Sequence, residues 1–462
     1  MSNFFVINEN TVARAPLKMS NETVKSLWHH FTFTESSLEI KEGEGLTFQI
    51  GECQVPTLKE GCEFTYNVTT EGISLIAKSY PSLLRGYFDL LMQIEVDYQN
   101  SGSLSIKVQT KEDGFKIKNR MIHFCIFKDT DRLRFRKLIR LAGVLGFTDV
   151  ILEFWSTLKF DCLQEYGWEG SYTKDEVRDL IREIRELGME PIPMINHLGH
   201  AAGSRITGGK HAVLDQNPKL HRLFMPDGWC WNIFNPDTLA ILRKMRQELY
   251  ELFGDCKYFH AGLDEAYTFS SNPEYRKALP DYLANVAKEI LSEGRRPMLW
   301  MDMFLPAESG TDHLCKCSVQ QMEAFLKTIP KETVLVDWNY DSTEFPMPTS
   351  KYLSGKTHHD VMIAPWDKTG NINAAIDTAK EWALFGVMMT TWHSMFISAS
   401  SILHAAHRMG CTRTPWLNTE DGELDKSETA SILRKLSFEG PNSYEDAGWV
   451  RNEILDNIGI LL

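Results

Sequence analysis

Two patterns of apolar and polar positions divide the chain near residue 115. In the first part, short apolar–polar alternations recur, for example over residues 46–50 and 72–76. A period of two predicts half-buried β-strands. A helical stretch over 80–93 and a further strand over 103–110 complete the pattern. We therefore expect a small, mostly antiparallel α/β domain over residues 1–115.

From residue 116 onward, apolar runs alternate with stretches of helical periodicity. The eight apolar runs cover residues 120–126, 148–154, 190–196, 257–262, 297–302, 333–338, 360–365 and 386–391. The helical patterns between them include 133–145, 174–187, 237–252, 274–292, 319–327 and 373–384. Strands that alternate with helices imply a parallel sheet, and eight such units favour a closed (β/α)8 barrel over a doubly wound sheet.

The expected architecture is thus an α/β fold with the barrel over residues 116–412. The small α/β domain precedes it. The remaining residues, 413–462, contain a polar stretch rich in Glu, Asp and Ser, and we expect them to form a short helical C-terminal appendage.

Composition narrows the class of protein and of partner. Of the 462 residues, 43% are hydrophobic and 24% charged, as in ordinary globular proteins. The net charge of −13 argues against nucleic acid and anionic membranes as partners. The N-terminus lacks a signal-peptide pattern, and no apolar run is long enough to span a bilayer. Nine cysteines without a disulfide or zinc spacing fit reduced thiols, so we expect a cytoplasmic protein.

Acidic and imidazole side chains stand where several barrel strands end, which is the edge at which barrel enzymes carry their active sites. The fourth strand runs into Asp264 and Glu265. Burying two carboxylates is costly, but chemistry that needs a proton donor beside a charged helper requires such a pair. The third strand leads to His200, and the fifth to Asp302. As an alternative, Asp264 could only cap a helix and His200 could have a purely structural role.

Four tryptophans follow the same edge at successive strands. They are Trp300, Trp338, Trp366 and Trp392, and Tyr340 lies close to the second of them. Aromatic faces around a few polar groups suit a sugar ring, whose C–H faces are apolar. Each tryptophan taken singly could be a core residue, and Arg120 on the first strand could be a structural ion-pair partner.

The run from His260 to Glu265 resembles the His-x-Gly-Gly-Asp-Glu signature of glycoside hydrolase family 20, the β-N-acetylhexosaminidases. Residues 193–200 resemble that family's Pro-Gly-His loop, and Arg120 stands at its substrate-binding arginine. Residues 72–91 resemble the α/β domain that often precedes its barrel. The resemblance extends over about residues 70–395.

The resemblance implies a retaining exo-β-N-acetylhexosaminidase that acts on small oligosaccharides or glycosides with a terminal β-linked GlcNAc or GalNAc. In this family the 2-acetamido oxygen of the substrate is the nucleophile and forms an oxazolinium intermediate. Glu265 would be the acid and base, and Asp264 would orient the acetamido N–H. No cofactor and no metal are implied.

The same resemblance assigns binding roles to the other candidates. Tyr340 would donate to the acetamido oxygen, and Arg120 would bind ring hydroxyls. His200 would support the site through Asp264 or the sugar. The pocket would be lined by Trp300, Asp302, Trp338, Trp366 and Trp392.

Four positions depart from the family pattern. Leu263 replaces the second glycine of the signature, and Ser394 stands where a glutamate is typical. No acid follows Arg120 on the first strand. Glu153-Phe-Trp155 stands in place of a His-Trp-His segment, so Glu153 is a candidate for a hydroxyl contact. These departures leave the expected reaction type unchanged, but they put the preferred hexosamine in question.

Two other functions remain open from the sequence. One is a metal-dependent barrel hydrolase with His197, His200, His260 and Asp264 as ligands, although its first strand offers only His123 rather than a His-x-His pair. The other is a sugar-binding protein without catalysis, against which the Asp264–Glu265 pair argues. Linkage and oligomeric state are not encoded in these patterns.

Overall fold

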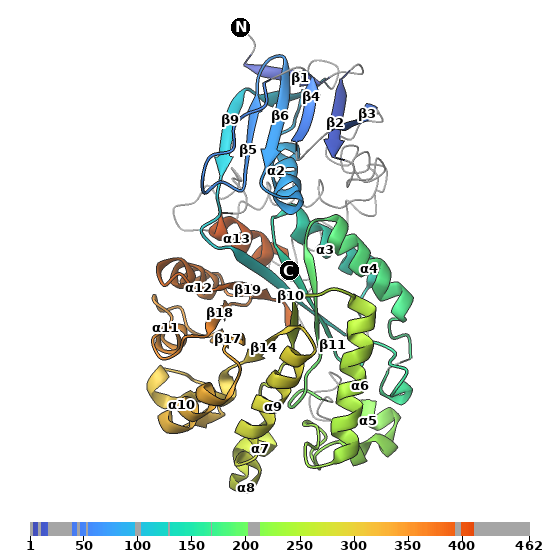
Figure 1. Ribbon diagram of the computed structural model, residues 1–462, viewed down its shortest axis with the longest axis vertical. Helices are drawn as coiled ribbons and strands as arrows, with labels where there is room; N and C mark the ends of the chain where they lie inside the picture. The colour runs from blue at the N-terminus through green and yellow to red at the C-terminus, as the bar shows by residue number, and fades with distance from the viewer. Residues whose placement is uncertain are drawn as a thin grey trace, which may run out of the picture.

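A closed barrel of eight parallel strands forms the centre of the computed structural model, with helices outside it and a smaller unit of sheets at one end (Figure 1). The structure describes residues 3–7, 11–16, 39–43, 47–51, 54–97, 103–127, 130–167, 169–201, 213–392 and 399–410. The predicted barrel with a small N-terminal domain is confirmed. The expected helical appendage over 413–462 lies outside the described residues.

The N-terminal unit contains a six-stranded sheet in the order β3-β2-β4-β6-β5-β9 and a three-stranded sheet in the order β1-β8-β7. Its strands are β1 Phe4–Ile7, β2 Val12–Pro16, β3 Glu39–Gly43, β4 Thr47–Gly51, β5 Phe64–Val68, β6 Gly72–Ala77, β7 Glu95–Asp97, β8 Ser103–Lys107 and β9 Gln109–Asp113. Among the strands that the structure describes in this unit, only β2 and β3 pair in parallel. The strand expected over 103–110 is instead two strands, because the chain passes from one sheet to the other at Val108.

Helix α2 (Tyr80–Met92), which follows β6 in the chain, packs between the six-stranded sheet and the barrel. Ser79 caps it by accepting from the amide of Ser82, and Pro81 lies in its first turn, where the missing N–H costs nothing. Leu84 of α2 lies against Gly188, just before the third barrel strand. The sheets therefore sit at the end where the barrel strands begin, as Figure 1 shows.

The barrel closes by parallel pairing of its first and last strands. Its strands are β10 Asn119–Ile126, β11 Asp149–Phe154, β12 Glu190–Met194, β13 Tyr258–His260, β14 Arg296–Trp300, β17 Val334–Trp338, β18 Asp360–Ala364 and β19 Gly386–Thr390. Each corresponds to one of the eight predicted runs. Two short strands, β15 (Leu305–Pro306) and β16 (Lys316–Cys317), pair with each other outside the barrel.

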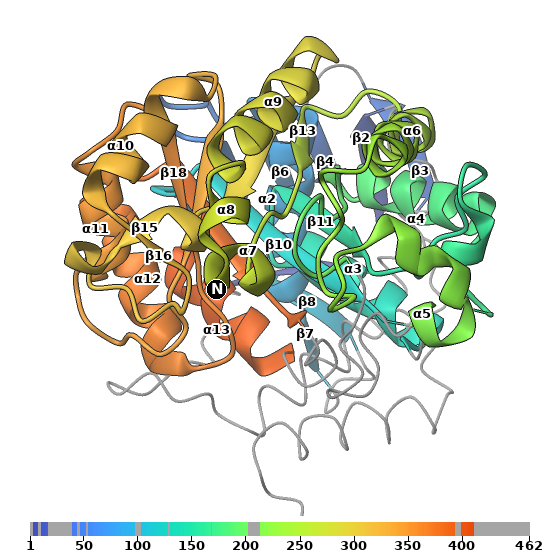
Figure 2. The same cartoon turned by 90° about the horizontal axis from the view of Figure 1, so that it is seen from below.

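Helices surround the barrel, as the end-on view in Figure 2 shows. They are α3 Arg132–Val144, α4 Lys174–Glu186, α5 Val213–Gln216, α6 Pro236–Phe253, α7 Tyr267–Ser271, α8 Pro273–Arg276, α9 Leu279–Ser292, α10 Val319–Thr328, α11 Pro348–Ser354, α12 Thr369–Glu381 and α13 Ala399–Met409. Short 3-10 helices occur at Gln164–Tyr166, Pro218–Leu223, Asp302–Phe304 and Ala307–Ser309. The helix expected over 274–292 is broken into α8 and α9, since Pro280 has no N–H to donate to the carbonyl of Arg276 four residues earlier.

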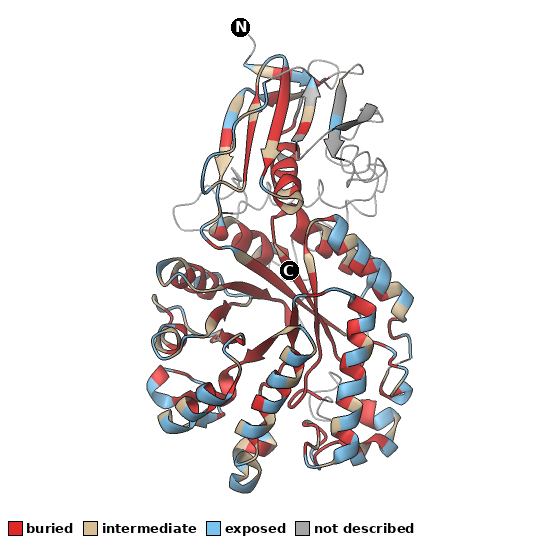
Figure 3. Cartoon of the chain, viewed as in Figure 1, coloured by how far each residue is buried: buried red, intermediate tan, exposed pale blue. Residues whose placement is uncertain are grey.

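Side chains of the barrel strands divide between two apolar clusters. On β10, Met121 and Cys125 point into the barrel, whereas Ile122 and Phe124 point outward to the helices. Figure 3 shows the strands buried and the outer faces of the helices exposed. Among the described residues, no helix has the length and apolar character needed to cross a membrane.

Candidate active site

Asp264 and Glu265 lie just beyond the end of β13, at the mouth of the barrel opposite the N-terminal unit. The Asp264 side chain is 3% exposed and that of Glu265 is 29% exposed. His200, from the loop after β12, places its Nε2 3.3 Å from Oδ2 of Asp264 and 3.0 Å from Oε2 of Glu265. The structure thus brings these three predicted residues together, with Asp264 on the inner side and Glu265 nearer to solvent.

Two glycines allow the loops that carry these residues to touch. Gly262 has a φ of +67°, and a Cβ there would lie 1.5 Å from Oδ1 of Asn196. A Cβ on Gly199 would lie 2.0 Å from the carbonyl oxygen of Asp264. The amide of His197 also donates to the carbonyl of Ala261 at 2.9 Å. The position of His200 against the carboxylates therefore depends on two residues without side chains.

Four site residues that carry a side chain adopt a left-handed backbone conformation. The φ angles are +54° at His200, +84° at Leu263, +47° at Glu265 and +45° at Trp392. Such conformations are strained for residues with a Cβ and tend to occur at functional sites. At Leu263 the angle explains why glycine suits that place in the signature, and burial of the leucine side chain helps to offset the strain.

Asp302 joins the carboxylate pair from the end of β14. Its Oδ2 accepts from the amide of Glu265 at 2.9 Å, which fixes the backbone of the outer carboxylate. Asp302 is buried, and burial together with the nearby charge of Asp264 raises its pKa well above the ordinary value. Protonation of Asp302 relieves the repulsion between two neighbouring carboxyl groups in one buried site.

Aromatic side chains from four strand ends line the inner side of Asp264. The Trp300 and Trp392 rings lie 5.7 Å apart, and Nε1 of Trp392 donates to the Tyr340 hydroxyl at 2.8 Å. The ring of Trp366 meets Tyr340 edge-on at 5.4 Å, and Trp338 stacks on Tyr340 at 4.9 Å. Charges of Asp264 and Glu265 contribute to the raised pKa of Tyr340, although burial is the main cause. The predicted aromatic group is therefore assembled around one tyrosine hydroxyl.

Arg120 lies outside this group, and its expected contact with a sugar is wrong. It stands at the start of β10, at the opposite end of the barrel from the carboxylates. Its guanidinium donates to the carbonyls of Ile117 and Gly146 and lies 3.8 Å from the Phe115 ring centroid. Strand register explains the difference, because side chains alternate along β10 and Met121 is the one that points inward. Ser394 lies outside the described residues.

Glu153 occupies the barrel mouth, but as the centre of a closed hydrogen-bond network. It is fully buried and accepts from Nδ2 of Asn196 at 2.6 Å and from the Trp155 indole. Its Oε2 lies 2.8 Å from Nε2 of His123. With three partners already present, Glu153 is better suited to orient its neighbours than to bind a substrate hydroxyl.

Two tryptophans contact the catalytic candidates and were not predicted as site residues. Trp155 stacks on the His200 ring at 5.1 Å with 28° between the planes. Trp229, in the turn before α6, donates from Nε1 to the carbonyl of Glu265 at 2.8 Å. Trp155 directly follows the end of β11, so the strand-end rule could have identified it. Nothing local to Trp229 marks it, because its contact joins distant parts of the chain.

The four residues considered as metal ligands do not converge. His197 points away from the mouth: its Nε2 lies 3.2 Å from Nη1 of Arg246 and its Nδ1 2.8 Å from the carbonyl of Ile195. Nδ1 of His260 accepts from the amide of Gly262 at 3.1 Å. Over the part of the chain that the structure describes, no group of three His, Cys, Asp or Glu is arranged to hold a metal ion.

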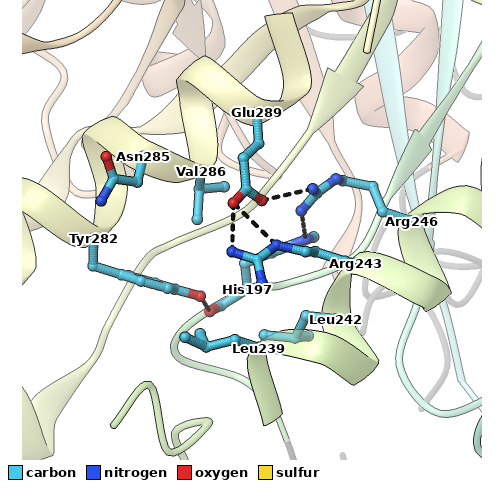
Figure 4. Close-up of a pocket in the computed structure, with 9 residues that line it drawn as sticks. All are labelled: His197, Leu239, Leu242, Arg243, Arg246, Tyr282, Asn285, Val286 and Glu289. Atoms are coloured by element: carbon cyan, nitrogen blue, oxygen red, sulfur yellow. Dashed lines mark hydrogen bonds and ion pairs between the residues drawn. The ribbon is translucent and has the colours of Figure 1, made fainter. Parts of the chain in front are cut away.

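A pocket of about 80 Å³ lies outside the barrel, between α6 and α9 (Figure 4). His197 forms part of its wall, and Arg246 links His197 to Glu289. Burial, with a smaller effect from Arg246, lowers the pKa of His197 to about 3, so this histidine is neutral at physiological pH. Neither Asp264 nor Glu265 lines this pocket, but the contact between Arg246 and His197 in its wall supports the loop that also carries His200.

Comparison of the sequence with known protein families and with known proteins points to one family in both cases. Residues 156–406, more than half of the chain, match the family model described as "Glycosyl hydrolase family 20, catalytic domain". The match begins after β10 and β11, which carry two of the four departures from the family pattern. A β-hexosaminidase from Emericella nidulans is 25% identical over 197 residues, which are 38% of this chain and 30% of that protein.

Solved structures share the fold over nearly the whole chain. The β-N-acetylhexosaminidase of Streptomyces coelicolor A3(2) superposes with a TM-score of 0.67 at 14% identity, covering 97% of this chain and 94% of that one. The exo-β-N-acetylglucosaminidase of Vibrio harveyi, in complex with N-acetylglucosamine, gives a TM-score of 0.65 at 15% identity and covers 100% and 76%. At these identities the likeness concerns the fold.

Proposed function

Because the chain belongs to glycosyl hydrolase family 20, we propose that it is a retaining exo-β-N-acetylhexosaminidase that uses substrate-assisted catalysis. The observation that carries this proposal is the pair Asp264–Glu265, one carboxylate inward and one outward, held against His200 beside an aromatic pocket. The substrate would be a glycoside or small oligosaccharide with a terminal β-linked GlcNAc or GalNAc.

The positions of the two carboxylates suit different steps. Asp264, buried beside the aromatic residues, accepts the acetamido N–H and stabilises the positive charge that develops as the acetamido oxygen attacks the anomeric carbon. Glu265, at the rim, protonates the leaving oxygen and then takes a proton from the attacking water. Two displacements at the anomeric carbon give net retention.

The aromatic residues supply the remaining contacts. Tyr340 accepts from Nε1 of Trp392 and also hydrogen-bonds the Thr390 side chain, and in this proposal its phenolic proton turns to the acetamido oxygen when the substrate binds. Burial keeps the tyrosine neutral and able to donate, because it raises the pKa of the phenol. Trp300 and Trp392 enclose the acetamido methyl group and the sugar face, which excludes water from the forming ring.

The proposal is tested by comparing p-nitrophenyl β-glycosides of GlcNAc and of glucose. Only the first carries the acetamido nucleophile, so its kcat/KM should exceed that of the glucoside by at least about a hundredfold. Proton NMR should show the β-anomer of free GlcNAc appearing first. Equal hydrolysis of both glycosides, or an α-anomer first, would contradict substrate assistance. Tight binding of GlcNAc without turnover would instead indicate a sugar-binding protein.

A further inference from the structure

Two partly exposed aromatic side chains contact Glu265, Trp229 through its carbonyl and Tyr267 through its carboxylate. Trp229 is half-buried, and the residue Tyr267 is 37% exposed. Their ring centroids lie 6.0 Å apart with 31° between the planes. We propose that Trp229 and Tyr267 form a binding platform for the leaving group, specific for a second sugar ring or an aromatic aglycone. This inference rests on the proposed function.

Trp229 is held in place from three directions. It lies in a turn closed by a bond from the Met225 amide to the Cys230 carbonyl. Its indole N–H donates to the Glu265 carbonyl at 2.8 Å, and its own carbonyl accepts from Ala201 at 2.9 Å. The turn is also tied to α7, because Asp227 accepts from the Thr268 hydroxyl. A ring fixed in this way binds a ligand with little further loss of side-chain entropy.

Tyr267 opens α7 only two residues after Glu265. Its hydroxyl hydrogen-bonds the Glu265 carboxylate, and burial together with that carboxylate raises its pKa well above the ordinary value. The tyrosine therefore remains a neutral donor beside the proposed acid. Its ring is anchored at one end by this bond, and the exposed remainder is available to a ligand.

The chemistry of the reaction places the leaving group next to these rings. Glu265 must reach the glycosidic oxygen to protonate it, and the inner side of the site is filled by Asp264, Trp300 and Tyr340. The group bonded to that oxygen consequently extends outward past Glu265, where Trp229 and Tyr267 lie. A pyranose or phenyl ring presents an apolar face that stacks on such a platform, whereas a methyl group does not.

Three substrates with the same GlcNAc ring distinguish the contribution of the platform to kcat/KM from that of the catalytic centre. They are the methyl β-glycoside, the p-nitrophenyl β-glycoside and the β-1,4-linked GlcNAc disaccharide. Tyr267→Ala and Trp229→Ala should each lower kcat/KM for the disaccharide by about tenfold relative to the wild type, because one stacking contact is lost. For the methyl glycoside the same variants lose only the contacts that Trp229 and Tyr267 make with Glu265, so the fall in kcat/KM should be clearly smaller than for the disaccharide.

The Tyr267→Phe variant keeps the aromatic ring but lacks the hydroxyl that bonds Glu265, so it distinguishes the effect of stacking from the effect of that hydrogen bond. It should retain the wild-type preference for the disaccharide over the methyl glycoside and shift the pH–rate profile. Phe234→Ala serves as the matched control, since Phe234 is an aromatic residue, 50% exposed, that packs on Phe269 and Tyr275 instead. It should leave all three rates unchanged.

The outcomes distinguish the platform from the proposed function. Equal losses on the methyl glycoside and the disaccharide, or no loss on either, would overturn the platform while the enzyme remains a hexosaminidase. A wild-type protein that hydrolyses none of the three substrates would overturn the proposed function itself. A GlcNAc thiazoline, which occupies only the inner site, should bind both alanine variants as it binds the wild type.

Discussion

At the scale of single residues, the site depends on how charge is distributed among three neighbouring carboxyl groups. His200 contacts Asp264 and Glu265, whereas Asp302 contacts only the amide of Glu265. Three ionised acids at this density would repel one another and would be poorly solvated. Burial and the nearby Asp264 raise the pKa of Asp302 well above its ordinary value, which favours the neutral form of this carboxyl group.

This distribution predicts the pH dependence of stability. An acid whose pKa is raised on folding contributes stability that is full below its unfolded pKa, about 4, and is lost as pH rises through the folded pKa. The Asp302→Asn variant has no carboxyl group to ionise, so it does not lose this stability as pH rises. Its side-chain oxygen can still accept a hydrogen bond from the Glu265 amide. The variant should therefore match the wild type near pH 4 and be more stable at pH 7, by on the order of 1 kcal/mol or about 2 °C in Tm.

Thermal unfolding of both proteins between pH 4 and pH 8 measures this difference. A stability gap that is constant over the whole range, or a variant less stable at pH 7, would show that Asp302 is ionised in the folded protein.

At the scale of elements, the active site is a junction between two loops, the one after β12 and the one after β13. The close approach at Gly262 joins them, with no room for a Cβ against Asn196. Arg246 on α6 supports the same junction from outside through His197, and Glu289 and Glu293 on α9 neutralise its charge. The scaffold thus controls the geometry of Asp264 through backbone packing.

Gly262→Ala tests this junction. The substitution should lower the free energy of unfolding by about 1–3 kcal/mol through overpacking, with left-handed strain in addition, and should lower kcat/KM by at least tenfold because His200 moves away from the carboxylates.

Gly294→Ala is the matched control. Gly294 has a φ of +84° but open space around its Cβ position, so it carries the strain of about 1 kcal/mol without the clash. Its kcat/KM should be unchanged. Similar activity in the two variants would mean that the contact between the loops does not position the catalytic groups.

At the scale of the whole molecule, the barrel and the carboxylate pair could be predicted from sequence because both signals are local. Eight apolar runs separated by helical periods reveal the strands, and a six-residue signature marks Asp264 and Glu265. Arg120 could not be placed in this way, since one step along a strand reverses the side chain and the register only becomes visible in the folded barrel.

Long-range contacts account for the other differences. Trp229 reaches Glu265 from a turn before α6, and no periodicity reports such a contact. His197 and His200 lie three residues apart in one loop, yet Arg246 holds His197 outside the barrel, whereas Asp264 and Glu265 hold His200 at its mouth. Sequence offers both as equivalent candidates, and only packing separates them.

The most direct test of the account is the hydrolysis of p-nitrophenyl β-GlcNAc by the wild type, Glu265→Gln and Asp264→Asn. Loss of the proton donor or of the acetamido partner should lower kcat by about 10²–10⁴-fold in each variant. Glu274→Gln, which changes an exposed acid on α8 that pairs with Lys277, should leave kcat unchanged. Turnover that survives both active-site substitutions would contradict the assignment of this carboxylate pair.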